Sequence, residues 1–479
     1  MIQMTASSAC NSTPEPLSVR LRRGSFFVVA VRFIGIGLGC MINVLLAGIL
    51  DKADFGRYSL ILTTTVIFST VARFGFDRLL MCRLVEIQPG ANRNAVTSLL
   101  KNAARVVVVT TLISAVGMAA LLSRFANIQE SGQASLLIVT AIVTMGLMTV
   151  LYLMAECFRG CHDLKLATFY DANRTGPLIC LVFSLLLLTG WVVTSLTLLH
   201  VMLSFLAAQL VVLVLASIDL SRTVGSGGPF GGDATVDVEQ IDQTHTRPPA
   251  KKMSSLQPRS LAWAASSIAA TQIIANLIVL GDTWVAGATV SAADLGNWSV
   301  VTQFVQLIAL PLFMINMTFI SAIPSLYRQG HTEELQRILQ ASATIATVIS
   351  LIPLALLICI PGWVISTVYG PDFMGAARPL AIISLGKLVF CWTGTCGHVL
   401  MLTGNERFVL LNNVVSALIL LSFGYLAAIS HGIVGLACVV SGVTILSNVV
   451  NWLVVRATVG IWTHASLRYF KSWRPLSRF

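Results

Sequence analysis

Polar side chains on one face of the first apolar stretch are the first candidates for chemistry in this sequence. Arg32, Gly35, Gly39 and Asn43 follow one another at offsets of 3, 7 and 11 residues, which places them near one side of a helix. A charged residue in an apolar helix costs free energy unless it faces a cavity or a partner, so this face predicts a polar cavity wall with one cation. The alternative is that Arg32 extends toward the membrane surface above a glycine packing stripe.

Two further helices of the first half carry acidic and basic residues at helical spacing. Arg73 and Asp77 are four residues apart, and Asp171 and Arg174 are three apart. An excess of two positive charges at membrane depth suits an anionic head group, and it results from six residues: Arg32, Arg73, Arg78, Arg174, Asp77 and Asp171. The alternative is that each pair is a structural ion pair that ties helices together.

The second half contains fewer ionisable residues. Asp282 and Lys387 each lie about eight residues from the outer end of their stretches, so we expect them to be able to meet, either at a cavity or as a structural pair. Lys387, Cys391, Gly394 and His398 follow one another at offsets of 4, 7 and 11 residues and are predicted to share a helix face.

No motif in the sequence predicts catalysis. The run from Cys157 to His162 has the wrong spacing for a haem attachment and lacks further ligands for zinc. The Gly-rich stretch near residue 225 lacks the Gly-Lys-Ser/Thr ending of a phosphate loop. The ten cysteines lie mostly in apolar stretches, where small packing residues are expected. We therefore expect no enzyme, no catalytic residue, no metal and no cofactor.

The elements that must position these candidates are membrane helices. The chain is 56% hydrophobic and 11% charged, against about a quarter charged in soluble domains. Apolar stretches of about 20 residues, the length that crosses a bilayer core, recur throughout. The predicted spans are 26–50, 58–80, 103–123, 134–156, 166–189, 196–218, 261–290, 298–323, 339–360, 379–402, 408–429 and 432–456.

A short echo between the two halves indicates an internal duplication. Ala53 to Ser59 reads Ala-Asp-Phe-Gly-Arg-Tyr-Ser, and Ala293 to Ser299 reads Ala-Asp-Leu-Gly-Asn-Trp-Ser, 240 residues later. The expected organisation is a cytoplasmic segment 1–25, a six-helix lobe 26–218, a flexible linker 219–260, a second six-helix lobe 261–456 and a basic tail 457–479. The predicted fold is an all-α integral membrane protein with about twelve transmembrane helices in two pseudo-repeated six-helix lobes.

The distribution of basic residues predicts the orientation. Loops on one side contain twenty lysines and arginines, and the opposite loops contain four: Lys52, Arg57, Arg124 and Arg378. The basic side is expected to be cytoplasmic, which places both termini and the linker there. The net charge of +11 is not clustered on a soluble face, so nucleic acid is not an expected partner.

Several blocks resemble one family of exporters. These are Asp282 to Arg337, Tyr369 to Leu380 (Tyr-Gly-Pro-Asp-Phe-Met-Gly-Ala-Ala-Arg-Pro-Leu), Leu402 to Arg407 (Leu-Thr-Gly-Asn-Glu-Arg) and Asp51 to Glu86. Together they resemble the polysaccharide flippases, the Wzx-type exporters of the multidrug/oligosaccharidyl-lipid/polysaccharide superfamily. The resemblance covers residues 25–215 and 260–456 and departs in the long 219–260 linker. It carries over no fixed set of binding residues.

The resemblance implies movement of a polyprenyl-pyrophosphate-linked oligosaccharide to the outer leaflet of the bacterial inner membrane, by alternating opening of two lobes around a cationic cavity. Membrane lipids, and a polysaccharide polymerase with its chain-length machinery, would be further partners. A cation-coupled antiporter of drugs or small solutes is the alternative within the superfamily. A facilitator-type sugar transporter would carry an Asp-Arg-x-Gly-Arg loop that is absent here, where Asp77 to Arg83 reads Asp-Arg-Leu-Leu-Met-Cys-Arg. A membrane polymerase or ligase would need a sizeable outer loop, and none is predicted.

Overall fold

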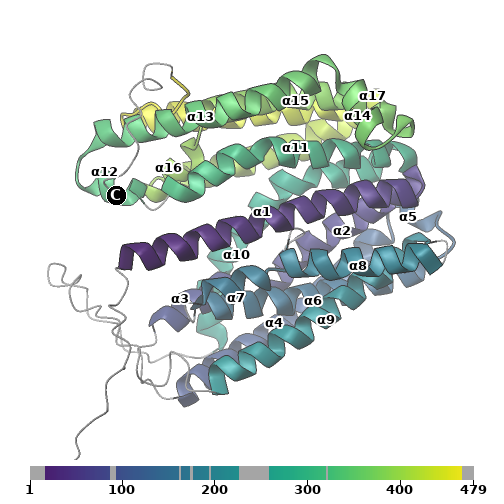
Figure 1. The fold of residues 1–479 in the computed structure, drawn as a ribbon, viewed down its shortest axis with the longest axis horizontal. Helices are drawn as coiled ribbons and strands as arrows, with labels where there is room; N and C mark the ends of the chain where they lie inside the picture. The colour runs from purple at the N-terminus through teal and green to yellow at the C-terminus, as the bar shows by residue number, and fades with distance from the viewer. Residues whose placement is uncertain are drawn as a thin grey trace, which may run out of the picture.

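The computed structural model describes residues 17–86, 93–160, 163–172, 176–193, 196–225, 258–319 and 322–466. These residues are mostly helical and contain no strand, and the long helices run side by side along the long axis of the molecule (Figure 1). The first lobe comprises α1 (Leu17–Ile49), α2 (Lys52–Arg73), α3 (Phe76–Glu86), α4 (Arg93–Leu122), α5 (Ala126–Gln129), α6 (Ala134–Gly160), α7 (Leu164–Phe169), α8 (Pro177–Val193) and α9 (Leu198–Gly225).

The second lobe follows the same plan with more short helices. Its elements are α10 (Pro258–Thr289), α11 (Ala292–Phe319), α12 (Ala322–Arg328), α13 (Thr332–Cys359), α14 (Pro361–Val368), the 3₁₀ helix η2 (Pro371–Ala376), α15 (Ala377–Thr393), α16 (Cys396–Leu402) and α17 (Glu406–Thr458).

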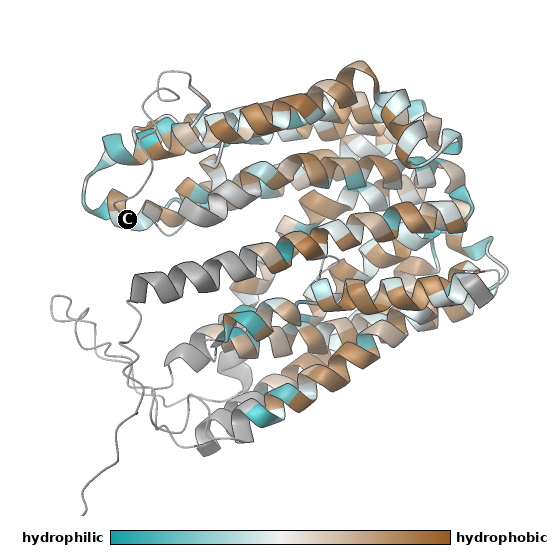
Figure 2. Cartoon of the chain, viewed as in Figure 1, coloured by the Kyte–Doolittle hydropathy of each residue, from teal (hydrophilic) through white to brown (hydrophobic). Residues whose placement is uncertain are grey.

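Twelve membrane passes can be assigned within the described residues. Ten helices are long and apolar enough to cross a bilayer. One of them, α17, departs from helical geometry at Gly432 and so supplies two passes. The shorter apolar helix α8 adds another, which gives six passes in each lobe. Hydrophobic residues fill the central lengths of these helices, and hydrophilic residues gather toward the turns (Figure 2). The expected all-α membrane fold is confirmed.

Three spans that we expected to be unbroken helices are interrupted. The stretch 58–80 breaks at Phe74 and Gly75, which both have left-handed backbone, with φ of 48° and 74°. The stretch 379–402 breaks at Gly394, with φ of 73°. The stretch 166–189 is divided between α7 and α8, and Pro177 begins α8. A left-handed residue ends a helix without changing the hydrophobic pattern, so the sequence pattern alone did not reveal the first two of these breaks.

The boundaries between the expected segments also shift. Helix α9 continues to Gly225 and α10 begins at Pro258, so both ends of the expected linker 219–260 are helical. Residues 226–257 lie outside the described residues. Helix α1 begins at Leu17, within the segment expected to precede the first span.

Residues 459–466, from the expected C-terminal tail, form a strap that packs into the second lobe. Thr463 Oγ1 donates to Thr393 O at 2.8 Å, and Ala465 N donates to Trp392 O at 2.8 Å. Both acceptors lie at the end of α15, where helical carbonyls have no partner within their own helix. The strap therefore satisfies the backbone groups that the break at Gly394 leaves open.

Candidate functional site

The two copies of the duplicated motif lie against each other where the lobes meet. Their first helical turns are capped at matched positions: Asp51 Oδ1 accepts from Asp54 N at 2.7 Å, and Ser291 Oγ accepts from Asp294 N at 3.2 Å. These caps start α2 and α11, which the contact pattern places side by side. The duplication inferred from the sequence therefore corresponds to one interface between equivalent helices.

Glycine allows the two helices to approach closely at this interface. A Cβ atom on Gly56 would lie 2.6 Å from Ala292 O, and one on Gly296 would lie 2.2 Å from Lys52 O. Lys52 and Ala292 are themselves matched positions, 240 residues apart, so the contact is symmetric. Any side chain at either glycine would require the backbones to separate.

Other contacts join the lobes at the same end, which carries α5 and α14 (Figure 1). Asn127 Nδ2, from α5, donates to Gly287 O and Val290 O at the end of α10, both at 3.0 Å. The rings of Phe55 and Phe373 meet edge to face with centroids 5.8 Å apart. We call this the closed end of the molecule.

A second seam joins α2 to α10 along their length. Three side-chain hydrogen bonds cross between the lobes along this seam, the last of them to Asp77 at the start of α3: Trp284 Nε1 to Thr64 Oγ1 (3.0 Å), Asn276 Nδ2 to Thr70 Oγ1 (2.8 Å) and Gln272 Nε2 to Asp77 Oδ2 (3.2 Å). Below them, a Cβ on Gly75 would lie 2.5 Å from Ala265 O of α10. The lobes are therefore in contact on this side well away from the closed end.

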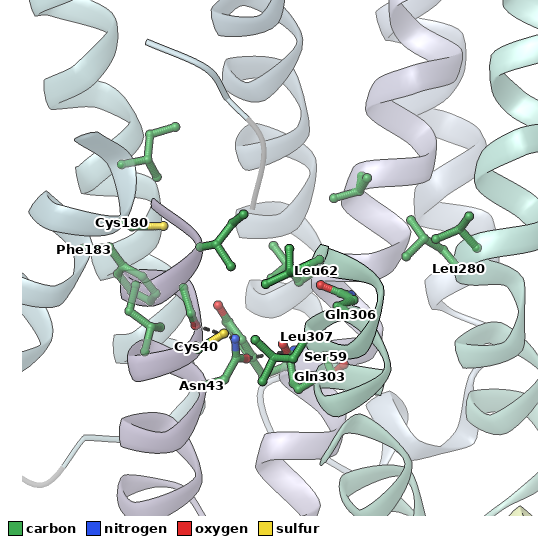
Figure 3. Close-up of a pocket in the computed structure, with 18 of the residues that line it drawn as sticks. Cys40, Asn43, Ser59, Leu62, Cys180, Phe183, Leu280, Gln303, Gln306 and Leu307 are labelled. Atoms are coloured by element: carbon green, nitrogen blue, oxygen red, sulfur yellow. Dashed lines mark hydrogen bonds between the residues drawn. The ribbon is translucent and has the colours of Figure 1, made fainter. Parts of the chain in front are cut away.

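A cavity of about 460 Å³ lies between the lobes, enclosed by α1, α2, α8, α9, α10 and α11. Its end nearest the closed end is lined by amides that meet across the lobes (Figure 3). Gln303 Nε2 of α11 donates to Asn43 Oδ1 of α1 at 3.2 Å, while Asn43 Nδ2 donates to Gly39 O at 2.7 Å. Ser59 and Gln306 also line this region. The predicted candidate Asn43 is thus part of the cavity wall.

Arg32 lines the cavity from the same helix, farther from the closed end. The eleven residues that separate it from Asn43 correspond to about 16 Å along α1. Among the described lining residues, Arg32 is the only one with a formal charge. The cavity thus has a cationic region and a neutral polar region at opposite ends of one helix face, as the spacing of Arg32 and Asn43 predicts.

Arg32 pairs with a carboxylate that comes from a different part of the first lobe. Its Nη2 lies 3.4 Å from Asp171 Oδ2, in the non-helical segment between α7 and α8. The same oxygen lies 3.3 Å from Arg159 Nη2, and Arg159 also pairs with Glu156. One carboxylate is therefore shared between two guanidinium groups. Neither Arg159 nor Glu156 was among the candidates from the sequence.

Arg73 and Asp77 form the expected pair but not at the cavity. Arg73 Nη1 lies 3.8 Å from Asp77 Oδ2, its Nη2 donates to Thr70 Oγ1 at 2.8 Å, and its Cζ lies 3.7 Å above the ring of Tyr152. Both partners are buried, and neither is among the lining residues described. Because Gln272 of α10 also bonds to Asp77, this pair belongs to the α2–α10 seam.

The remaining candidates do not gather at the cavity. Arg174 lies outside the described residues. Asp282 is buried, accepts from Thr283 N at 2.6 Å and interacts electrostatically with Lys387, as the sequence suggested. His398 is exposed on α16, beyond the break at Gly394, so the single helix face predicted for Lys387 and His398 was wrong.

Three amides of the second lobe were missed in the sequence and line the cavity: Asn276, Gln303 and Gln306. Their signal was a repeat of polar residues in apolar stretches, with Gln303 and Gln306 three apart and Gln272 and Asn276 four apart. Amide and guanidinium groups can bind and orient a ligand through hydrogen bonds. Within the described ranges, no group of three His, Cys, Asp or Glu side chains is placed to hold a metal ion.

Two family models match the sequence. Residues 21–327, more than half of the chain, match the model described as a polysaccharide biosynthesis protein. Residues 267–426 match the model described as MatE. A comparison with curated proteins finds no match.

Solved structures of similar fold are transporters. An inward-facing multidrug resistance MATE transporter of the MOP superfamily gives a TM-score of 0.63 at 12% identity, covering 93% of this chain and 100% of that chain. The lipid II flippase MurJ, in an inward closed conformation, gives 0.58 at 12% identity, covering 93% and 89%. A MOP superfamily transporter from Pyrococcus furiosus gives 0.54 at 14% identity, covering 92% and 96%. At these identities the likeness concerns the fold.

Proposed function

The chain belongs to the polysaccharide biosynthesis protein family and has the fold of the MOP transporters, and from this premise we propose that it flips a polyprenyl-pyrophosphate-linked oligosaccharide. The substrate would move from the cytoplasmic to the outer leaflet of the bacterial inner membrane. The side with most basic loops would face the cytoplasm, as would both termini. A polymerase and its chain-length machinery would then use the product on the outer side.

The observation that carries this proposal is the charge of the cavity. Arg32 is the only formally charged side chain among the described lining residues, and the other polar groups are neutral. A pyrophosphate is an anion that guanidinium groups bind through charge-assisted hydrogen bonds. Asp171 is shared between Arg32 and Arg159, so an arriving phosphate oxygen would compete with this carboxylate for Arg32.

The physical need for such a cavity is clear. Sugars and pyrophosphate cannot cross hydrocarbon unaided, because burying their polar groups without partners costs several kcal/mol per group. The cavity offers these groups partners within the membrane, while the lipid tail stays in the bilayer. Lobe movement about the closed end would then change the side to which the cavity opens.

A cation-coupled antiporter of drugs or small solutes is the second candidate, supported by the MatE match over residues 267–426. Such a protein would need to hold an organic cation, for which a carboxylate is the usual partner. No carboxylate is among the described lining residues, and Asp171 is paired with two arginines. The cavity therefore favours the anionic lipid.

The proposal can be tested with purified full-length protein in liposomes. A fluorescent polyprenyl pyrophosphate carrying a short oligosaccharide is placed in both leaflets, and a membrane-impermeant reductant then quenches the outer label. Flipping should raise the quenched fraction from about half toward completion, and Arg32→Ala should slow this rise strongly. An organic cation such as ethidium should not accumulate under a proton or sodium gradient. If the protein transported ethidium but did not move the lipid, the antiporter function would be supported and the flippase function would be wrong.

A further inference from the structure

The part of the cavity between Arg32 and the closed end has its own chemical character. Its polar groups are neutral amides and hydroxyls from four helices of both lobes: Asn43, Tyr58, Ser59, Asn276, Gln303 and Gln306. Among the lining residues that the structure describes, no charged group lies in this part. Amides and hydroxyls both donate and accept hydrogen bonds, which matches the hydroxyl groups of a sugar.

We infer that this region is the glycan subsite of the proposed flippase, that it selects neutral sugars, and that Asn43 and Gln303 determine this selectivity. The inference rests on the proposed function for its substrate class. A uronic acid placed here would bring a carboxylate away from water without a cation to pair with it, which costs far more free energy than burying a hydroxyl that finds an amide.

The opposite walls of this region suit the other surface of a sugar. Leu62 and Val66 of α2 and Leu280 of α10 line it with apolar side chains, and Figure 3 shows Leu62 and Leu280 opposite the Asn43 side. Phe183 and Phe205 add apolar surface elsewhere in the cavity, with their rings in edge contact, 5.1 Å between centroids, and Figure 3 shows Phe183 on the side of Cys40 and Asn43. A pyranose ring has polar edges and apolar faces, so it can use both kinds of wall at once.

The geometry of α1 sets the order of the two subsites. A pyrophosphate at Arg32 leaves about 16 Å of helix before Asn43, so the first sugars lie beside the middle of α1 and later ones reach the amides. The cavity volume of about 460 Å³ falls in the range of roughly 300–1,000 Å³ that holds small ligands. It therefore accommodates a few sugar rings, and the rest of a longer repeat unit extends out of it.

The selection of the sugar involves both lobes, because Asn43 and Gln303 come from different lobes and form a hydrogen bond with each other. Asn43 belongs to α1 and Gln303 to α11, and their side chains bond at 3.2 Å across the boundary. A sugar hydroxyl inserted there replaces this bond with one to each amide. A neutral glycan thus forms hydrogen bonds to both lobes. A carboxylate can accept from Gln303, but it leaves the oxygen of Asn43 next to another negatively polarised oxygen.

The test compares three fluorescent polyprenyl pyrophosphates in liposomes that contain the full-length protein. One carries a neutral hexose trisaccharide, the second the same trisaccharide ending in glucuronic acid, and the third no sugar. The unaltered protein should flip the neutral probe at least about tenfold faster than the acidic one, the factor expected for one lost buried hydrogen bond. Gln303→Lys should speed the acidic probe, and Gln303→Glu should slow it further, while the sugar-free probe changes little.

A surface glutamine provides the matched control. Gln329 is exposed at the turn between α12 and α13, so Gln329→Lys adds the same charge without entering the cavity and should leave selectivity unchanged. Binding is measured separately as protection from maleimide in a variant that retains only Cys40, which lines the cavity. This readout applies even to a variant that binds but does not transport.

The outcomes separate the two proposals. The subsite proposal would be wrong if the neutral and acidic probes were flipped equally fast and protected Cys40 equally well, and if substitutions of Gln303 changed neither result. If the sugar-free probe still moves in an Arg32-dependent way, the flippase function stands. If no probe moves and none protects Cys40, both the function and the subsite are wrong.

Discussion

Gly56 and Gly296 face each other across the boundary between the lobes, and each occupies a position where the other helix leaves no room for a Cβ atom. They are the same residue of the duplicated motif, so equivalent positions of the two lobes are in contact. The closed end therefore contains the same close approach of a glycine to a backbone oxygen twice, once from each copy of the motif.

Adding a methyl group to this contact should weaken the closed end. Gly296→Ala is expected to destabilise more than Gly56→Ala, because its Cβ would lie 2.2 Å rather than 2.6 Å from a backbone oxygen. Overpacking of this kind costs typically about 1–3 kcal/mol. The melting temperature of the purified protein measures it, with Gly48→Ala as control because nothing lies within 4 Å of its Cβ position. Equal stability of all three variants would contradict the tight contact.

Arg32 should govern transport rather than stability. Loss of a charge-assisted hydrogen bond of about 1.5–3 kcal/mol predicts that Arg32→Ala slows flipping by roughly ten- to a hundredfold. Arg32→Lys should recover part of the rate, since lysine cannot form a bidentate contact. Transport and membrane abundance are measured together, with Arg328→Ala, an exposed arginine at the end of α12, as control. Normal flipping by Arg32→Ala at normal abundance would remove Arg32 from the binding site.

Arg73 and Asp77 should govern stability rather than transport. They are buried at the α2–α10 seam, and removing one partner of a buried pair typically costs about 3–5 kcal/mol. We expect Arg73→Ala and Asp77→Ala to lower the melting temperature by similar amounts, and the double substitution by less than their sum. Transport per folded molecule should stay near normal. A strong transport defect in a stable Arg73→Ala protein would place this arginine in the substrate path.

The orientation in the membrane can be measured with single cysteines. A cysteine at Ser226 should react with an impermeant maleimide from the cytoplasmic side only, and one at Ser291, exposed between α10 and α11, from the outside only. The expectation follows from the basic loops on one side of the sequence. Labelling of position 226 from outside would reverse the proposed direction of transport.

The strap should loosen as the pH falls. Burial holds the pKa of His464 below its usual value, and its neutral Nδ1 accepts from Trp452 Nε1 at 3.3 Å. The unfolded chain binds the proton first, so the strap loses stability as the pH drops below the ordinary histidine pKa of about 6.5. The protection factors of residues 459–466 against amide exchange, which correct for the intrinsic rate, should fall between pH 7.5 and 5.5.

A substitution isolates the histidine in that experiment. His464→Phe keeps an aromatic ring against Trp392 and Trp462 but cannot take up a proton. Exchange in this variant should depend on pH only through the intrinsic rate of the amides. The same fall in protection in both proteins would show that another group is responsible.

The sequence predicted the helices well because bilayer thickness sets their length and hydrophobic pattern. It also predicted Arg32 and Asn43 as residues of one lining face, since both lie on a single uninterrupted helix. The face from Lys387 to His398 failed because Gly394 interrupts its helix, and a glycine in left-handed conformation looks in the sequence like any other glycine.

Long-range pairing could not be predicted for a different reason. Arg32 meets Asp171, 139 residues away, because α1 packs against α7 and α8, and helical periodicity describes only neighbours within one helix. Gln303 was missed because one neutral amide in an apolar helix is a weak signal, although it lines the cavity. The repeated motif likewise indicated a duplication, but not that Gly56 and Gly296 would be in contact.

The strap also bears on how the protein is made. Thr463 and Ala465 satisfy carbonyl groups at the end of α15, yet they leave the ribosome after the whole of α17. Until then, the carbonyl groups of Trp392 and Thr393 lack these hydrogen-bond partners. The second lobe therefore reaches its final form only after its last helix has been inserted. A chain that ended before Thr463 would contain helices α1 to α17 but would lack the hydrogen bonds that complete the second lobe, so assembly of this lobe depends on a segment that is synthesised after its last helix.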